Sequence, residues 1–128
     1  MRQYLLDTHT LLWMQDDNKT LSTTAREILE DSRCSLYLSV ASLWEISIKQ
    51  SLGKLQLEYT LDELSESCLS NNILILPIQL SALNILKNLP FIHLDPFDRI
   101  IVSTAIDMNF DLITKDLNLH KYDTNTIW

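Results

Sequence analysis

Short, mainly apolar runs alternate with longer segments of helical periodicity along this chain of 128 residues. The short runs predict strands at residues 3–7, 36–39, 74–76, 111–114 and 126–128. The periodic segments predict helices at residues 8–16, 23–32, 41–52, 60–71, 79–88 and 96–108. Such alternation is typical of βαβ units built around a parallel sheet, so the pattern predicts an α/β fold.

Local signals mark the ends of several predicted helices. Ser22 or Thr24 can cap the second one, and Thr24 also opens a sequence that resembles a capping box. Gly53 is expected to end the third helix, because glycine readily adopts the left-handed conformation found there. Asp95 as the N-cap and Pro96 at the first helical position define the start of the last helix.

Four acidic residues accompany the apolar segments, namely Asp7, Glu45, Asp98 and Asp116. Two come at the ends of predicted strands and two lie near the starts of predicted helices. Since ligands of parallel α/β sheets bind at the carboxyl ends of the strands, we expect all four to point into one crevice. Carboxylates beside an apolar core need a partner, and several together suit a hard divalent cation.

Each acid taken alone also has an ordinary structural interpretation. Asp7 can cap the following helix, and Asp98 is favoured near a helix N-terminus by the helix dipole. Asp116 is a common type of turn residue, and Glu45 can face solvent. The prediction of a cation site therefore depends on the four acids together.

Composition is that of an ordinary globular protein, with 46% hydrophobic and 21% charged residues. The length fits a single domain over residues 1–128. No apolar stretch approaches the roughly 18 residues of a membrane helix, and the start does not resemble a secretory signal, so we expect a cytoplasmic protein. Cys34 and Cys68 form no paired motif and are expected to be free, buried thiols.

Several function classes lose support from the sequence. The net charge of −7 argues against non-specific nucleic-acid binding, unless bound cations or a positively charged partner reverse the local field. A single glycine excludes both the P-loop and the GxGxxG motif. The three histidines lack zinc-motif spacing, and no GxSxG motif supports acyl transfer. Trp13 and Trp44 lie on apolar helical stripes, which favours a core or dimer interface over base stacking.

Taken in order, segments along nearly the whole chain resemble PIN-domain proteins of the VapC type, the toxin half of type II toxin–antitoxin pairs. The segments are LLDTHTLLW at 5–13, SVASLWEISIK at 39–49, GKL at 53–55, LP at 89–90, DPFDR at 95–99, ITKD at 113–116, and Tyr122. The resemblance implies a three-layer α/β/α PIN-like fold with a central, mostly parallel sheet. It also implies an Mg²⁺- or Mn²⁺-dependent endoribonuclease, a cognate antitoxin and a homodimer.

By position, the four acids match the catalytic, metal-binding quartet of the resembled family. Thr8 and Thr114 are implied to support the carboxylates or a metal-bound water. Asp95 is expected to cap its helix, with indirect contact to the metal as the alternative, and Arg99 to pair with a carboxylate or contact phosphate. The sequence departs from relatives at Ile92-His93, where two histidines are frequent, and in the helix at 100–105, and these departures concern substrate preference more than catalysis.

The quartet suggests a mechanism in which one or two cations activate water for in-line attack on a phosphodiester of RNA. Four lysines are candidates to guide the RNA, although a solvated surface role is the more common one: Lys49, Lys54, Lys115 and Lys121. Two other classes compete with this hypothesis. One is a catalytically silent PIN-fold module that binds an antitoxin or RNA. The other is a phospho-accepting receiver domain, which is disfavoured because Asp7 has no acidic neighbour.

Overall fold

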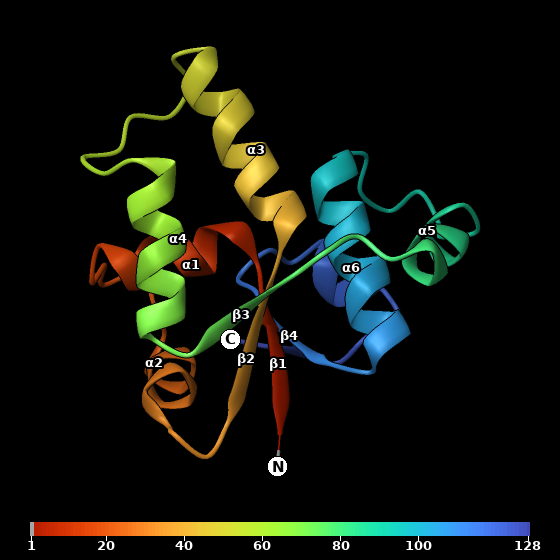
Figure 1. Ribbon diagram of the computed structural model, residues 1–128. Coiled ribbons are helices and arrows are strands. Elements are labelled where there is room, and N and C mark those ends of the chain that lie inside the picture. Colours follow the sequence, from red (N-terminus) through yellow and green to blue (C-terminus); the bar gives the residue numbers. More distant parts are fainter. Residues whose placement is uncertain (1) are drawn as a thin grey trace.

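The computed structural model describes residues 2–128 and contains a five-stranded sheet in the order β3-β2-β1-β4-β5 (Figure 1). Every pair of neighbouring strands is parallel, which confirms the predicted α/β class. The strands are β1 (Gln3–Leu6), β2 (Ser35–Ser39), β3 (Ile73–Leu76), β4 (Asp111–Ile113) and β5 (Thr126–Ile127). Because all strands run the same way, their carboxyl ends meet at one edge of the sheet.

Helices cover both faces of the sheet and complete the three-layer α/β/α arrangement. Figure 1 shows α1, α2 and α4 on one side and α5 and α6 on the other. Their bounds are α1 (Thr8–Gln15), α2 (Thr23–Glu30), α3 (Val40–Ser51), α4 (Leu61–Ser70), α5 (Leu80–Leu86) and α6 (Pro96–Met108), and a short 3₁₀ helix follows at Leu119–Lys121. No helix within residues 2–128 is long and apolar enough to cross a membrane.

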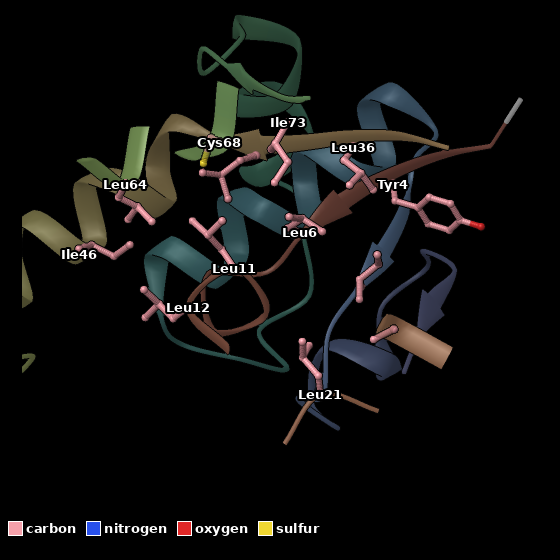
Figure 2. Packing of buried hydrophobic residues seen from close by; sticks show 13 residues of the cluster. Tyr4, Leu6, Leu11, Leu12, Leu21, Leu36, Ile46, Leu64, Cys68 and Ile73 are labelled. Atoms are coloured by element: carbon pink, nitrogen blue, oxygen red, sulfur yellow. The ribbon is translucent and has the colours of Figure 1, made fainter. Parts of the chain in front are cut away.

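Alternating side chains of the strands feed two cores, one on each face. Leu6 of β1 packs with α1 and α4 residues such as Leu11, Leu64 and Cys68 (Figure 2). Leu5 points to the opposite face, where it joins a cluster that includes Ile101 and Val102 of α6. All of these side chains are fully or almost fully buried, and each buried leucine of this kind stabilises the fold by roughly 1.5–3 kcal/mol.

The helix caps confirm some predictions and correct one. Ser22 caps α2, since its Oγ accepts a hydrogen bond from the Ala25 amide at 3.0 Å. Thr24 therefore lies inside the helix, and the capping box predicted there is wrong. A capping box does occur at the start of α4, where Thr60 and Glu63 exchange hydrogen bonds of 3.1 Å.

The structure also tests the predictions for Gly53 and for the two cysteines. Gly53 has a φ of +68° directly after the C-cap of α3, as expected for the residue that ends this helix. Cys34 and Cys68 are both free, but only Cys68 is fully buried, while Cys34 is partly exposed.

Candidate metal centre

A pocket of about 380 Å³ opens where the carboxyl ends of the strands meet the starts of the helices. All four predicted acids line it, together with a fifth acid and several basic and aromatic side chains. The full lining consists of Asp7, His9, Trp13, Glu45, Lys49, Asp95, Asp98, Lys115 and Asp116. The structure therefore brings together carboxylates that lie as far apart as residues 7 and 116 in the sequence.

Asp7 lies at the junction of β1 and α1 and is only 5% exposed. Its Oδ1 accepts a hydrogen bond from the Thr8 amide and its Oδ2 accepts one from the Thr114 hydroxyl, both at 2.8 Å. Burial raises the pKa of Asp7 above its usual value, although these two hydrogen bonds act in the opposite direction. Asp7 is thus a helix cap and a pocket carboxylate at once, and the two interpretations do not exclude each other.

The two threonines near Asp7 have different roles. Thr114 donates to Asp7 and also accepts a hydrogen bond from the Asp116 amide at 3.1 Å, so one hydroxyl orients two acidic residues. Thr8 supports the Asp7 carboxylate only through its main chain. Its side-chain hydroxyl instead donates to Ser42 at 2.9 Å and ties α1 to α3.

Glu45 on α3 is 3% exposed, so the interpretation as a solvent-facing residue is wrong. Its Oε2 accepts a hydrogen bond from Lys49 Nζ at 2.6 Å, one helical turn further along. Its Oε1 is buried without a hydrogen-bond partner. A buried acceptor left unpaired costs about 1–3 kcal/mol, and a cation in the pocket would supply the missing partner.

Lys49 serves as an internal counter-ion rather than an isolated surface lysine. Burial by itself would lower the pKa of Lys49, but the hydrogen bond and charge of Glu45, with the charges of Asp95 and Asp98, raise it above its usual value. The ammonium group therefore stays charged at neutral pH beside a cluster of carboxylates.

Asp98 lies in the first turn of α6, where Asp95 caps the helix as predicted. The Asp95 carboxylate accepts hydrogen bonds from the amides of Phe97 at 2.8 Å and Asp98 at 3.2 Å. Burial of Asp98, followed by the charges of Asp7, Asp95, Glu45 and Asp116, raises the pKa of Asp98 to about 8. So many carboxylates cannot all ionise at close range unless a cation joins them.

His93 is a pocket-side residue that the sequence interpretation missed. Its Nε2 lies 3.3 Å from Asp98 Oδ2 and 3.3 Å from Asp116 Oδ2, so it bridges the two acids. Its Nδ1 accepts a hydrogen bond from the Asp95 amide at 3.1 Å, which in a neutral imidazole leaves the proton on Nε2. Its position, two residues before the DPFD sequence, is the feature of the sequence that indicates that His93 lies near the acids. The absence of zinc-motif spacing among the histidines gives no such indication.

Nitrogen and oxygen atoms of His93, Asp98 and Asp116 all lie within 4.8 Å of one another, so the two carboxylates are close enough to share one metal ion, while a protonated Nε2 of His93 would donate hydrogen bonds to them rather than bind the metal. Asp116 also forms the turn expected of it, because its Oδ1 accepts a hydrogen bond from the Asn118 amide at 2.9 Å. The two oxygens of this carboxylate thus face different ways, one toward the turn and one toward the acids.

Arg99 does not line the pocket, and no carboxylate among residues 2–128 forms an ion pair with it, so the expected pairing with a carboxylate is wrong, while contact with phosphate stays a prediction. Its guanidinium is buried and donates to the carbonyl oxygens of Pro90 at 2.8 Å, Leu89 at 3.1 Å and His93 at 3.3 Å. It also lies over the ring of Phe91, 4.3 Å from the centroid. Arg99 therefore fixes the loop that carries His93.

The chain belongs to the PIN domain family, whose model matches residues 4–125. No curated protein matches the sequence. Among solved structures, it is similar to a chain of VapBC2 from Rickettsia felis bound to a promoter DNA fragment, with a TM-score of 0.73, 16% identity, and coverage of 98% of this chain and 97% of that one. The DNA-bound VapBC of Salmonella typhimurium gives a TM-score of 0.67 at 17% identity, covering 99% and 98%. VapBC-1 of nontypeable Haemophilus influenzae gives 0.64 at 17% identity, covering 98% and 96%.

Proposed function

We propose that this protein is a divalent-metal-dependent endoribonuclease that acts as the VapC-type toxin of a toxin–antitoxin pair. The observation that carries the proposal is the convergence of four carboxylates, one of which keeps a buried oxygen without a partner. Membership of the PIN domain family and similarity to chains of VapBC complexes support the same conclusion. Oxygen donors of this kind suit Mg²⁺ or Mn²⁺.

Asp7, Glu45, Asp98 and Asp116 are the residues that would hold the metal. When bound, Mg²⁺ or Mn²⁺ would lower the pKa of a coordinated water and would stabilise negative charge that develops on the phosphodiester. Thr114 and the Thr8 amide keep Asp7 in one orientation through their hydrogen bonds. A bound cation would favour ionisation of Asp98, because its charge would offset the burial and the repulsion from neighbouring acids that raise the pKa of this group.

The proposal is tested by Asp98→Asn and Asp7→Asn, which remove one negative charge each with little change of shape. We expect both variants to lose Mg²⁺-dependent cleavage of RNA and to bind Mn²⁺ at least tenfold more weakly in calorimetric titration. Glu66→Gln is the matched control, because Glu66 is an exposed acid on α4 outside the pocket. Full cleavage by either site variant, with circular dichroism unchanged, would refute the assignment.

A partner protein follows from the same proposal. Free toxin would act on RNA in the cytoplasm, so its activity needs an inhibitor, and a basic segment of an antitoxin fits the acidic pocket and the net charge of −7. We also propose a homodimer, for which Trp44 on α3, 56% exposed, is a candidate contact. Co-purification with the product of an adjacent gene and light scattering on the free toxin test these two points.

The alternative is a PIN-fold module that binds RNA or an antitoxin without cutting. One observation favours it, since Lys49 already neutralises part of the quartet through Glu45. Mn²⁺ binding without cleavage of any RNA substrate, in a preparation freed from antitoxin, would favour this alternative over the nuclease.

A further inference from the structure

The pocket has an aromatic and basic side in addition to its acidic side. His9 and Trp13 on α1 line it together with Lys115, which directly precedes Asp116. The rings of His9 and Trp13 lie one helical turn apart, with centroids 5.6 Å from each other and planes inclined by 37°. Two ring systems of one helix therefore lie within the same 380 Å³ space as the four acids.

Trp13 is held in place from the side of the core. Trp128 packs against it in an edge-type contact, with a centroid distance of 5.6 Å and an angle of 62°, and Trp13 also contacts the buried cluster around Leu11 and Leu12. Its indole is only partly buried, however, and it lines the pocket. Trp13 thus packs against the core as predicted, and the same ring also presents a fixed surface to a ligand in the pocket.

Lys115 supplies a positive charge beside this surface. Its Nζ lies 5.9 Å from the centroid of the Trp13 ring, at the outer limit of a cation–π contact. Among residues 2–128 no carboxylate forms an ion pair with it, whereas Lys49 in the same pocket is paired with Glu45. Lys115 is therefore the pocket cation that remains available to an anionic ligand.

We infer that His9, Trp13 and Lys115 form a subsite for one unpaired nucleobase and its phosphate, next to the bond that is cut. The inference rests on the proposed ribonuclease function and adds the residues that hold a base and a phosphate beside the metal site. The pocket combines the three chemistries of a nucleotide, with carboxylates for metal at the scissile phosphate, an ammonium for a neighbouring phosphate, and aromatic rings for the base. A volume of 380 Å³ is near the small end of ligand pockets and suits one nucleotide rather than a duplex.

The subsite takes a base that is not stacked on its neighbours in the RNA. A base stacks on a protein ring only when it has left its own stack, and unpaired loops and ends provide such bases. Stacking on an aromatic ring contributes about 1–3 kcal/mol per base and tolerates any base type. The subsite therefore selects for an unpaired nucleotide more than for a particular sequence.

Steady-state kinetics on a short fluorescent single-stranded RNA test the subsite. We expect Trp13→Leu to raise KM about tenfold and Lys115→Gln and His9→Ala to raise it several-fold, with kcat changed less than twofold. Tyr59→Leu is the matched control, since Tyr59 packs against the same core but lies outside the acidic pocket. His9 is exposed, so His9→Ala keeps the test valid if Trp13→Leu proves unstable in thermal unfolding.

An abasic substrate gives the sharper result. Two RNAs are compared, one lacking the base on the 5′ side of the scissile phosphate and one lacking the base on its 3′ side. One of the two should bind wild type about tenfold more weakly than intact RNA does. Trp13→Leu should bind both abasic RNAs and the intact RNA equally. Equal KM for all variants and for abasic RNA would overturn the subsite while leaving the ribonuclease proposal intact. If no RNA is cleaved, the ribonuclease proposal fails, and RNA binding measured by fluorescence anisotropy still decides whether the subsite exists.

Discussion

The carboxyl group of Asp98 stays protonated at neutral pH in the metal-free protein, because burial and four neighbouring acids raise its pKa to about 8. In the unfolded chain the same group has a pKa near 3.8 and releases its proton at a much lower pH. Between these two values the folded state binds more protons than the unfolded state. The contribution of Asp98 to stability is therefore fully present at low pH and is lost as pH rises toward 8.

Asp98→Asn is expected to remove much of this pH dependence. With EDTA present, the free energy of unfolding of wild type should fall by a few kcal/mol between pH 5 and pH 8.5, and the variant should fall less. Urea denaturation at three pH values measures the difference, with Glu66→Gln as the control that keeps the wild-type slope. Equal slopes for Asp98→Asn and wild type would show that Asp98 ionises normally.

Thr114→Val tests whether the hydroxyl that connects Asp7 and Asp116 matters for metal binding. The change keeps the side-chain shape but removes the donor to Asp7 and the acceptor for the Asp116 amide. We expect Mn²⁺ affinity in calorimetric titration to fall about tenfold or more, because partners of ligands orient them. Thr10→Val is the matched control, since it also loses one buried hydrogen bond, here to the Ile113 carbonyl, without touching an acid. Similar losses of Mn²⁺ affinity in both variants would contradict the role of Thr114.

At the scale of elements, α6 shows why some boundaries follow from sequence. Its predicted start and end agree with the observed Pro96–Met108, and the start follows from Asp95 and Pro96, which act locally. The start of α2 was less clear, since Ser22 and Thr24 offered competing caps and only the folded backbone selected Ser22. Local chemistry thus determines an element end when a single residue can supply the cap.

Lys49 and Glu45 belong to one helix, α3, and we expect their ion pair to contribute to the free energy of unfolding of the protein. Lys49→Met leaves Glu45 buried without any partner, so we expect the metal-free protein to lose about 1–3 kcal/mol of unfolding free energy. The lower part of this range is expected because Lys49 is 37% exposed and solvent screens the pair. Mn²⁺ should then raise the melting temperature of the variant more than that of wild type. An unchanged melting temperature without metal would show that Glu45 does not depend on Lys49.

At the scale of the whole molecule, the sequence predicted that the acids would converge but not which side chains would pair with them. Parallel strands bring Asp7 and Asp116 to one edge, and this follows from the alternating pattern alone. The bridge from His93 to Asp98 and Asp116 depends on a loop held by Arg99, which has no periodic signature. The strand order β3-β2-β1-β4-β5 likewise depends on packing of both cores rather than on any local motif.

The net charge of −7 predicts an unusual response of RNA binding to salt. Each phosphate neutralised on a single strand contributes about −0.7 to the slope of log affinity against log salt concentration. Lys115 is the pocket cation free of a carboxylate partner, so we expect few phosphates, about three at most, to be neutralised. The slope should therefore be no steeper than about −2. Lys115→Gln should reduce its magnitude by about 0.7, whereas Lys87→Gln, an exposed charge outside the pocket, should leave it unchanged. Fluorescence anisotropy at fixed Mn²⁺ and increasing KCl measures both slopes. A steep slope that Lys115→Gln does not alter would place RNA on another surface, because many phosphates would then be neutralised away from the acidic pocket.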